Sequence, residues 1–373
     1  MKFVIIGSGP AGSSAAYFLS KDGHEVVLVD PKGPNEKTCG GGVPAKCLQR
    51  FPEFYTDFKP AETLLEDMTF AFDGKDLCEI SMPKGMGIFS RKNHDMHIFQ
   101  KALDLGAKYL KETFKDCEKS ESGWLVKTNR QEFEVDFILG ADGAVSRVRN
   151  KLAKKLPREA YFKAIDYLVT QPDLPLHIGF DKKLNGYLWV FPRENNCSIG
   201  IVDFDDDQTQ RMQMLDDYMR SFDVPENQIV KKRSALIPSL RKQDLKEHEI
   251  SGEKWALVGD AAALAEPITG EGIYYAVYSS WLFADCLKKG DDYNKRWKSE
   301  FRQIVQEAHI SRTSYKFLNR SFMKFFLKKS SLLRKMTGEH LAAFETGRTH
   351  RAKFFLSLPL IAIQSLFSKS VKV

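Results

Sequence analysis

The sequence lacks several features that would define a protein class at once. Its six cysteines are scattered and form no Cys-x-x-Cys pair, so we expect neither a disulfide framework nor a metal site, but reduced and mostly buried thiols. The mean hydropathy of −0.36 excludes a polytopic membrane protein. No internal repeat and no low-complexity segment is visible in the sequence, so we expect an ordinary globular chain.

The two ends of the chain differ in what they lack. Only Met1 and Lys2 precede the first apolar run, which leaves no room for a signal or transit peptide, and we therefore expect a cytoplasmic protein. The tail, Ser311–Val373, is poor in acids, because thirteen Lys and Arg stand against two Asp and Glu. The whole chain carries +7, so the basic character belongs to the tail and indicates an anionic partner.

What is present begins with a strand–turn–helix–strand unit over Lys2–Asp30. The apolar runs Phe3–Ile6 and Val26–Val29 are short enough to be buried parallel strands. Between them lie a G-x-G-x-x-G turn and apolar residues at helical spacing. Strand, helix and terminal acid together form a dinucleotide-binding fingerprint, which by itself does not distinguish FAD from NAD.

Each residue type in this turn has a physical reason. Gly7 permits the tight turn, Gly9 lets the backbone approach a pyrophosphate, and Gly12 lets the helix pack closely on the sheet. The helix N-terminus offers free N–H groups and a positive dipole end to the phosphates. We expect Asp30 to accept hydrogen bonds from the ribose hydroxyls of the adenosine.

Two later strand ends repeat this arrangement. Phe137–Gly140 predicts a buried strand that ends in GADGAVSRVR, which places the carboxylate of Asp142 and a helix start at a ligand edge. Trp255–Val258 predicts another strand, followed by Asp260. We expect the next helix to begin with a first turn at Gly270–Gly272, where its dipole would stabilise the negative charge of a reduced flavin.

Two further stretches indicate contact with a flat or apolar ligand. TCGGGVP, Thr38–Pro44, contains three consecutive glycines, which will not sit in a regular element and suggest backbone close to a flat ligand. GYLWVFP, Gly186–Pro192, places Tyr187 and Trp189 on one face of a predicted strand, where both can line a lipid cavity or simply pack in the core.

The remaining pattern predicts a second, antiparallel sheet and several helices. We expect a hairpin over Leu65–Pro83 with its turn at Asp73–Gly74, a helix over Arg91–Leu105, strands over Ala107–Phe114 and Gly123–Thr128, several antiparallel strands within Tyr161–Phe204, and a helix over Gln208–Phe222. A chain of 373 residues is long enough for two domains.

Taken in order, these motifs resemble a known family. GSGPAG, GADGAVSR and GDAA…P…GEGI resemble the FAD-dependent oxidoreductases of the para-hydroxybenzoate-hydroxylase fold. TCGGGVP and GYLWVFP, with Arg91 four residues before Asp95, resemble the geranylgeranyl reductase family within that group. The resemblance implies an α/β protein: a Rossmann-like FAD-binding domain with an inserted antiparallel-sheet substrate domain and a helical C-terminal region.

The resemblance also implies a division of the chain and a set of site residues. The FAD-binding domain would comprise residues 1–64, 90–157 and 248–290, the substrate-binding sheet domain residues 65–89 and 158–247, and the helical basic region residues 291–373. The implied FAD contacts are Gly7, Gly9, Pro10, Ala11, Gly12, Asp30, Pro31, Cys39, Gly40, Gly41, Arg91, Asp142, Gly259, Asp260, Pro267, Gly270, Gly272 and Ile273, and the implied catalytic residues are Cys39, Tyr187 and Trp189.

The implied chemistry is the saturation of isolated isoprenoid double bonds with non-covalently held FAD. An isolated alkene has no carbonyl to polarise it, so hydride must reach one carbon and a proton the other in a dry apolar cavity. Cys39 is then a candidate proton donor or gate, with a buried packing thiol as the alternative. The reductant stays open between NAD(P)H and a reduced ferredoxin or quinol, because no second nucleotide fingerprint is visible.

The tail bears on the substrate. Lys316, Arg320, Lys324 and Lys328 recur every four residues, and Leu318, Phe322, Phe325 and Phe326 lie on another face. This pattern is typical of peripheral contact with the inner face of a membrane, and it disfavours nucleic acid. Packing against the protein itself or a dimer partner is the alternative. Two other functions stay open: an FAD-dependent monooxygenase acting on an aromatic or quinone, and a membrane-associated electron-carrying flavoprotein.

Overall fold

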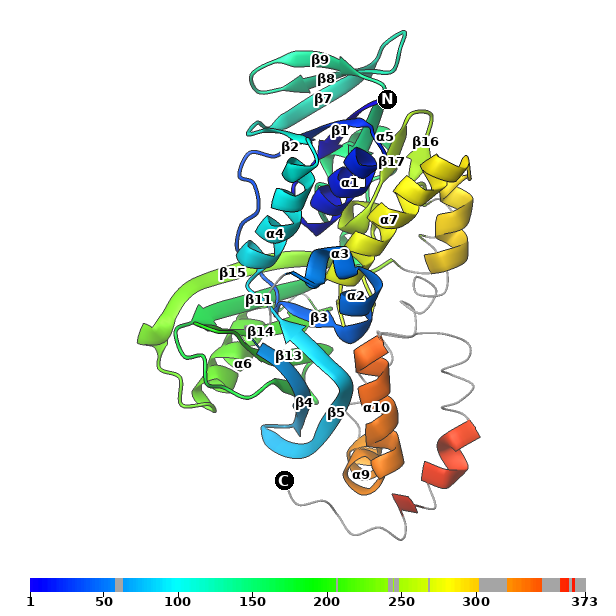
Figure 1. Cartoon of the computed structure of the whole chain (residues 1–373). Coiled ribbons are helices and arrows are strands. Elements are labelled where there is room, and N and C mark those ends of the chain that lie inside the picture. The colour runs from blue at the N-terminus through cyan, green and yellow to red at the C-terminus, as the bar shows by residue number, and fades with distance from the viewer. Residues whose placement is uncertain are drawn as a thin grey trace. The chain divides into compact units, whose positions relative to one another are not determined.

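The structure is a computed structural model, and it describes residues 1–57, 63–205, 207–240, 244, 248–267, 269–301, 321–343, 356–361 and 364–365. Contacts between residues divide the chain into two compact units. The first unit contains the described residues of Met1–Glu36, Arg91–Tyr161 and Leu236–His309, and the second contains those of Lys37–Ser90, Phe162–Ala235 and Ile310–Val373. Figure 1 shows the chain coloured along its length.

The first unit is built on a six-stranded, mostly parallel sheet with the strand order β16-β17-β10-β1-β2-β6. These strands are β1 (Lys2–Ile6), β2 (Glu25–Val29), β6 (Lys108–Leu110), β10 (Phe137–Gly140), β16 (Ser251–Gly252) and β17 (Trp255–Leu257). β1 lies between β2 and β10, with Val4 opposite both Val27 and Ile138. The short apolar runs form central parallel strands because both faces of the sheet are covered.

Helices of the first unit pack closely on one another. α1 (Pro10–Lys21) contacts both α4 (Arg91–Asp104) and α7 (Ile273–Lys289), and Figure 1 shows α1 beside α7. Further helical elements in the described part of this unit include α5 (Arg147–Leu152), η1 (Arg158–Ala160) and η4 (Gly259–Ala262). The apolar side of α1, including Ala15, Ala16 and Leu19, is completely buried, which anchors the helix directly after the first glycine turn.

Two expectations for the first unit need correction. Ala107–Phe114 is not one strand: β6 pairs with β2, while β7 (Phe114–Lys119) begins a separate antiparallel sheet with β8 (Trp124–Thr128) and β9 (Glu132–Val135). The glycines Gly270 and Gly272 do not form the first turn of α7, because Gly270 has φ +71° and Gly272 is the residue that precedes the helix.

The second unit is built on an eight-stranded sheet with the order β15-β11-β14-β13-β12-β4-β5-β3. Its strands are β3 (Gly42–Pro44), β4 (Thr63–Phe72), β5 (Lys75–Ile88), β11 (Tyr161–Val169), β12 (His177–Phe180), β13 (Gly186–Pro192), β14 (Cys197–Asp203) and β15 (Ile229–Pro238). Helices in the described part of this unit include α2 (Ala45–Arg50), α3 (Pro52–Tyr55), α6 (Gln208–Arg220), η2 (Glu226–Gln228), α9 (Ser321–Lys329) and α10 (Ser331–Ala343). The predicted hairpin is confirmed, with its turn at Asp73 and Gly74.

Packing in the second unit joins segments that the predicted domain division separates. Lys37–Leu64 belongs to this unit rather than to the first, because β3 pairs with β5. α10 also packs on β5, and a Cβ at Gly338 would lie 1.8 Å from the carbonyl oxygen of Ser81, so the helix approaches the strand backbone directly. The helical C-terminal region is thus confirmed for its described part. The functional names of the domains stay a prediction.

Candidate functional site

The first turn of the parallel sheet can only be made with glycine. Gly7 has φ +105°, and a Cβ there would lie 2.4 Å from the carbonyl oxygen of Ala141. A Cβ at Gly12 would lie 1.8 Å from the carbonyl oxygen of Gly7. α1 begins after Gly9 with Pro10 in its first turn and without a side-chain cap. Its N-terminal N–H groups and positive dipole end therefore remain available to an anionic group such as a phosphate.

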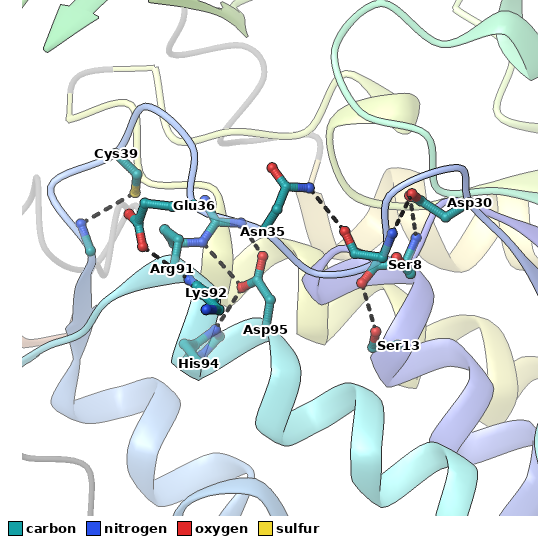
Figure 2. A network of polar contacts seen from close by, with 12 residues as sticks. Ser8, Ser13, Asp30, Asn35, Glu36, Cys39, Arg91, Lys92, His94 and Asp95 are labelled. Atoms are coloured by element: carbon teal, nitrogen blue, oxygen red, sulfur yellow. Dashed lines mark hydrogen bonds and ion pairs between the residues drawn. The ribbon is translucent and has the colours of Figure 1, made fainter. Parts of the chain in front are cut away.

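Asp30 lies at the end of β2, beside this turn (Figure 2). Its Oδ2 accepts a hydrogen bond from the backbone N–H of Ser8 at 3.1 Å, and its Oδ1 accepts from those of Lys32 and Gly33 at 2.8 and 3.0 Å. The Tyr109 hydroxyl donates to the Asp30 carbonyl oxygen at 2.8 Å. A carboxylate has about four acceptor positions, so these contacts orient Asp30 and leave capacity for a hydroxyl donor.

Arg91, at the start of α4, is fixed by a bidentate ion pair with Asp95 (Figure 2). Its Nε and Nη2 donate to Oδ1 and Oδ2 of Asp95 at 3.1 and 2.8 Å. His94 Nδ1 lies 2.9 Å from Asp95 Oδ1. Burial alone would raise the pKa of Asp95, but Arg91 and His94 hold it well below its usual range. The guanidinium is thereby held in one orientation while a carboxylate balances its charge.

In the second turn, after β10, the carboxylate of Asp142 accepts hydrogen bonds from the protein itself. The Asp142 carboxylate accepts from the Ser146 hydroxyl at 2.5 Å and from the backbone N–H groups of Arg147 and Val148 at 2.7 and 3.2 Å. Burial raises the pKa of Asp142. Asp142 therefore caps α5 as well as lying at the strand end, and its contact with FAD stays a prediction.

The third turn, after β17, brings α7 against α1. Gly259 has φ +58°, and a Cβ there would lie 2.8 Å from the Ala11 side chain. The Gly259 N–H donates to Ser279 Oγ at 2.9 Å, and Ser280 Oγ donates to the Ala11 carbonyl oxygen at 2.8 Å. A Cβ at Gly272 would lie 3.3 Å from Asp260 Oδ1, which places that carboxylate at the start of α7.

Glu271 lies between the two glycines that precede α7. Its Oε1 accepts from the backbone N–H of Tyr274 at 2.7 Å. Its Oε2 is buried and has no hydrogen-bond partner among the described residues. Burial, reinforced by the neighbouring acids Glu266 and Asp260, raises the pKa of Glu271 to about 8. At neutral pH its neutral form predominates, so this helix start carries less negative charge than its sequence suggests.

Arg149 and His248 bind the backbone of the third turn. Neither residue was predicted from the sequence. Both are buried, and their side chains donate to the adjacent carbonyl oxygens of Ala261 and Ala262, the latter at 3.0 Å from His248 Nε2. Burial lowers the pKa of His248 to about 3 and that of Arg149 to about 10. Arg149 closes the GADGAVSRVR stretch, so its place in that motif was the one available signal.

In the first unit, the predicted residues therefore gather at one edge of the parallel sheet. Gly7, Asp30, Asp142 and Gly259 follow the carboxyl ends of β1, β2, β10 and β17, which lie side by side. Nucleotide ligands of open α/β sheets bind at this edge. The uncapped start of α1, the turn that only glycine can make, and the oriented Asp30 carboxylate fit a bound dinucleotide. Pro31, Pro267 and Ile273 border the same turns.

In the second unit, the glycine-rich loop is held from two sides. Gly41 has φ +87°, and a Cβ there would lie 2.0 Å from the carbonyl oxygen of Phe89, whose N–H donates back to the Gly41 carbonyl oxygen at 2.9 Å. The ring of Phe191 would meet a Cβ at Gly40 at 2.9 Å. The Gly41 N–H lies 3.3 Å from Cys39 Sγ and donates to it (Figure 2). Gly42 begins β3, so only part of this loop is irregular.

Trp189 of β13 is fixed by a buried relay that the sequence did not reveal. Its Nε1 donates to Ser198 Oγ at 3.1 Å, and Ser198 Oγ donates to Asp166 Oδ2 at 2.9 Å. Arg233 forms an ion pair with Asp166 and donates from Nε at 3.0 Å. A Cβ at Gly200 would lie 2.1 Å from the indole. The relay ties Trp189 to a single orientation.

Tyr187 and Trp189 share a strand face as predicted, with ring centroids 6.1 Å apart. Trp189 is 5% exposed, whereas Tyr187 is partly exposed. Among residues that the structure describes, no group of His, Cys, Asp and Glu side chains could hold a metal ion. Within the same part of the chain, we find no helix with the length and apolar character needed to cross a membrane.

Comparison with known proteins adds the following similarities. Residues 1–168 match the family model described as pyridine nucleotide-disulphide oxidoreductase. The geranylgeranyl diphosphate reductase of Rhodobacter capsulatus is 30% identical over 289 residues, covering 73% of this chain and 71% of that protein. The digeranylgeranylglycerophospholipid reductase of Methanocaldococcus jannaschii is 24% identical over 376 residues, covering 91% and 88%.

A solved structure matches the fold over almost the whole chain. It is a geranylgeranyl bacteriochlorophyll reductase-like protein from Thermoplasma acidophilum, with a TM-score of 0.77, 18% identity and 97% coverage of both chains. This likeness confirms the α/β fold with parallel and antiparallel sheets and a helical C-terminal region.

Proposed function

Because the chain belongs to the geranylgeranyl reductase family of flavin-dependent oxidoreductases, we propose that it uses FAD to reduce carbon–carbon double bonds of an isoprenoid or related lipid-like chain. The observation that carries this proposal is the dinucleotide-binding edge of the parallel sheet in the first unit, where the uncapped start of α1, the Gly7 turn and the oriented Asp30 carboxylate lie together. Relatives named as reductases of geranylgeranyl groups support the substrate class.

Three features of the first unit would hold the cofactor. The start of α1 would bind the pyrophosphate through its N–H groups. Asp30 would accept a hydrogen bond from the adenosine ribose, and Asp260 from a hydroxyl of the ribityl chain. When bound and reduced, FAD would supply a hydride, which carries both electrons of the reduction.

Residues of the second unit would orient the alkene, exclude water and supply a proton. The partly exposed ring of Tyr187, with the buried ring of Trp189 beside it, would contact the isoprenoid chain. Cys39 is the proposed proton donor: it is partly exposed, whereas the other five cysteines are buried. Reduction of one double bond adds one hydride and one proton, so two C–H bonds form and one C–C π bond is lost. The thiol is then reprotonated from solvent.

We also propose peripheral contact with an anionic membrane, where lipid-like substrates reside. Phe325 is 44% exposed, Leu356 78% and Leu360 60%. Gln364 accepts hydrogen bonds from Ser330 Oγ and the Leu332 N–H, which ties the described part of 356–365 to the corner between α9 and α10. Exposed apolar residues rimmed by lysines are typical of interfacial binding.

The predicted basic stripe supports this contact only in part. Lys316 and Arg320, with Leu318, lie outside the described residues. Lys324 forms an ion pair with Asp73 in the β4–β5 turn, so its charge is already balanced. Lys328 is exposed and available to a lipid surface. The reductant is proposed to be NAD(P)H or a reduced ferredoxin, and the choice between them is left to experiment.

The decisive experiment is an anaerobic single turnover. Protein with chemically reduced flavin is mixed with geranylgeranyl diphosphate or an unsaturated archaeal-type glycerophospholipid. We expect the oxidised flavin spectrum to return and product mass to rise by two hydrogens per double bond. No reoxidation with either substrate would overturn the proposal. In a parallel aerobic assay, oxygen consumed in proportion to an aromatic or quinone substrate would instead support the monooxygenase alternative, whose fold this chain shares.

A further inference from the structure

We propose that Arg193 is a positioning residue that holds Cys39 in place through the backbone of the glycine-rich loop. Its Nη2 donates to the carbonyl oxygen of Cys39 at 2.8 Å and lies 3.4 Å from that of Gly40. The inference rests on the proposed function, in which Cys39 delivers the proton. Neither the family motif nor the sequence pattern pointed to this arginine, which directly follows GYLWVFP.

Burial makes this contact specific. Arg193 is 2% exposed, so its guanidinium has been removed from water and depends on protein acceptors. Hydrogen bonds that involve a charged group are roughly twice as strong as neutral ones. The guanidinium bridges two consecutive carbonyl groups of a loop that is otherwise rich in glycine. Glycine makes such a loop intrinsically mobile, so an external anchor has a large effect on its position.

The strand geometry explains why Arg193 reaches the loop. Tyr187, Trp189, Phe191 and Arg193 alternate along β13 and its extension, so their side chains leave the same face. Phe191 packs against Gly40 and Gly42, where a Cβ would lie 2.9 Å from its ring in both cases. The strand therefore supplies an apolar support under the glycines and a cationic anchor at the Cys39 carbonyl.

The far side of the loop is closed by a third contact. The Gly41 carbonyl oxygen accepts a hydrogen bond from the backbone N–H of Phe89. The Gly41 N–H donates to Cys39 Sγ at 3.3 Å. Rotation of the Cys39 peptide would break both the contact with Arg193 and the hydrogen bond to the sulfur. The orientation of the thiol is thus coupled to Arg193, although the two side chains need not touch.

The thiol itself provides a probe that needs no substrate. Cys39 is the one partly exposed cysteine among the six, all of which the structure describes. A thiol reagent such as dithionitrobenzoate should modify it first, and peptide mass spectrometry identifies the modified residue. In Arg193→Met we expect Cys39 to react about 10- to 100-fold faster than in the wild type, because a charge-assisted anchor of the loop is lost.

Two further variants protect the test against misfolding. Arg193→Lys keeps the positive charge but lacks the planar guanidinium with its several N–H donors. We therefore expect Cys39 to be labelled at a rate between those of the wild type and Arg193→Met. Gly40→Ala forces the loop away from Phe191 and should also accelerate labelling while Arg193 is intact. Arg220→Met, at an arginine in α6 whose side chain is 59% exposed, is the matched control and should label like the wild type.

The outcomes separate this inference from the proposed function. Unchanged Cys39 labelling in folded Arg193→Met, with only a lower melting temperature, would show a merely structural arginine and overturn the inference. Faster labelling together with failure of the anaerobic turnover in the wild type would support the anchor and overturn the reductase proposal. If both stand, Arg193→Met should lower kcat for alkene reduction more than it changes the rate of flavin reduction.

Discussion

The backbone N–H of Ser8 and the carboxylate of Asp30 join the ends of β1 and β2 through a hydrogen bond of 3.1 Å. This contact lies where a dinucleotide would pass from its pyrophosphate to its ribose. The same carboxylate also orders the turn through Lys32 and Gly33. A substitution at Asp30 therefore acts on both the ligand and the turn, and the two effects can be measured separately.

We expect Asp30→Asn to weaken FAD retention by about 10- to 100-fold, because a charge-assisted hydrogen bond of about 1.5–3 kcal/mol is lost. Fluorescence titration of apoprotein with FAD measures this, and the released cofactor is identified by chromatography as FAD rather than FMN. Thermal unfolding of the apoprotein reports the effect on the turn. An apoprotein that takes up no FAD in the wild type would contradict the cofactor proposal.

A second prediction concerns the relay behind Trp189. Ser198→Ala removes the acceptor of the buried indole N–H and one donor to Asp166. We expect a loss of about 1–3 kcal/mol in the free energy of unfolding, measured by urea denaturation. Ser234→Ala, at an exposed position of β15, is the control and should stay within about 0.5 kcal/mol of the wild type. Equal stability of the two variants would show that the relay is energetically unimportant.

Much of the first unit could be predicted because its signals are local. β1, the glycine turn and β2 lie within one thirty-residue window, and only glycine fits Gly7 and Gly12 sterically. The β4–β5 hairpin was equally predictable, since Asp73–Gly74 interrupts two strand-forming runs. Where the structure uses a short-range pattern, the sequence contains the information.

The parts that escaped prediction depend on long-range partners. Ala107–Phe114 looks like one strand, but β6 is recruited by β2 and β7 by β8. Arg149, His248, Asp166 and Arg193 are fixed by contacts across 32 to 154 positions of the chain. The sequence alone does not show whether a charged residue is buried or exposed to solvent. Its role can be recognised only once the fold shows which partner it contacts.

A third prediction tests the proposed proton donor. Cys39→Ser should slow alkene reduction by about 100-fold or more while flavin reduction changes little, because the hydroxyl is a much weaker acid than the thiol. Stopped-flow absorbance separates the two half-reactions. Cys47→Ala removes a buried thiol from the same unit and serves as the control. Unchanged alkene reduction in Cys39→Ser would return Cys39 to a packing role.

A fourth prediction concerns the membrane surface. Leu356→Ser with Leu360→Ser should reduce sedimentation with anionic liposomes at all salt concentrations, since burial of apolar side chains resists salt. Lys328→Glu should reduce it mainly at low salt, by about 1 kcal/mol for the lysine removed, because salt screens that attraction.

Two controls accompany these variants. Leu105→Ser changes an apolar residue that is 43% exposed in the first unit, and it should leave sedimentation unchanged. Lys324 is left intact because its pair with Asp73 makes its loss a structural change. If the native protein does not sediment, or if the leucine variants sediment as well as it does, the tail is a packing or dimer element.

The last prediction follows from Glu271, whose pKa is raised to about 8 mainly by burial. Its ordinary pKa is 4.5, so between these values the folded state retains a proton that the unfolded state has lost. The free energy of unfolding therefore falls as pH rises through this window, by at most about 1.4 kcal/mol per pH unit from this one group. Below the unfolded pKa the contribution is fully present, and above about 8 it is lost.

Glu271→Gln keeps the shape of the neutral acid and removes its titration. Urea unfolding of wild type and variant between pH 5 and 8 should give curves that diverge with rising pH, the variant losing less stability. Glu249→Gln, at an exposed acid of the same unit, is the control and should follow the wild type.

Because a neutral Glu271 adds no negative charge beside the start of α7, we also expect the pH dependence of the bound flavin's reduction potential to change in Glu271→Gln near pH 8. Parallel unfolding curves would show that Glu271 is ionised in the folded protein, and the helix start would then carry a full negative charge.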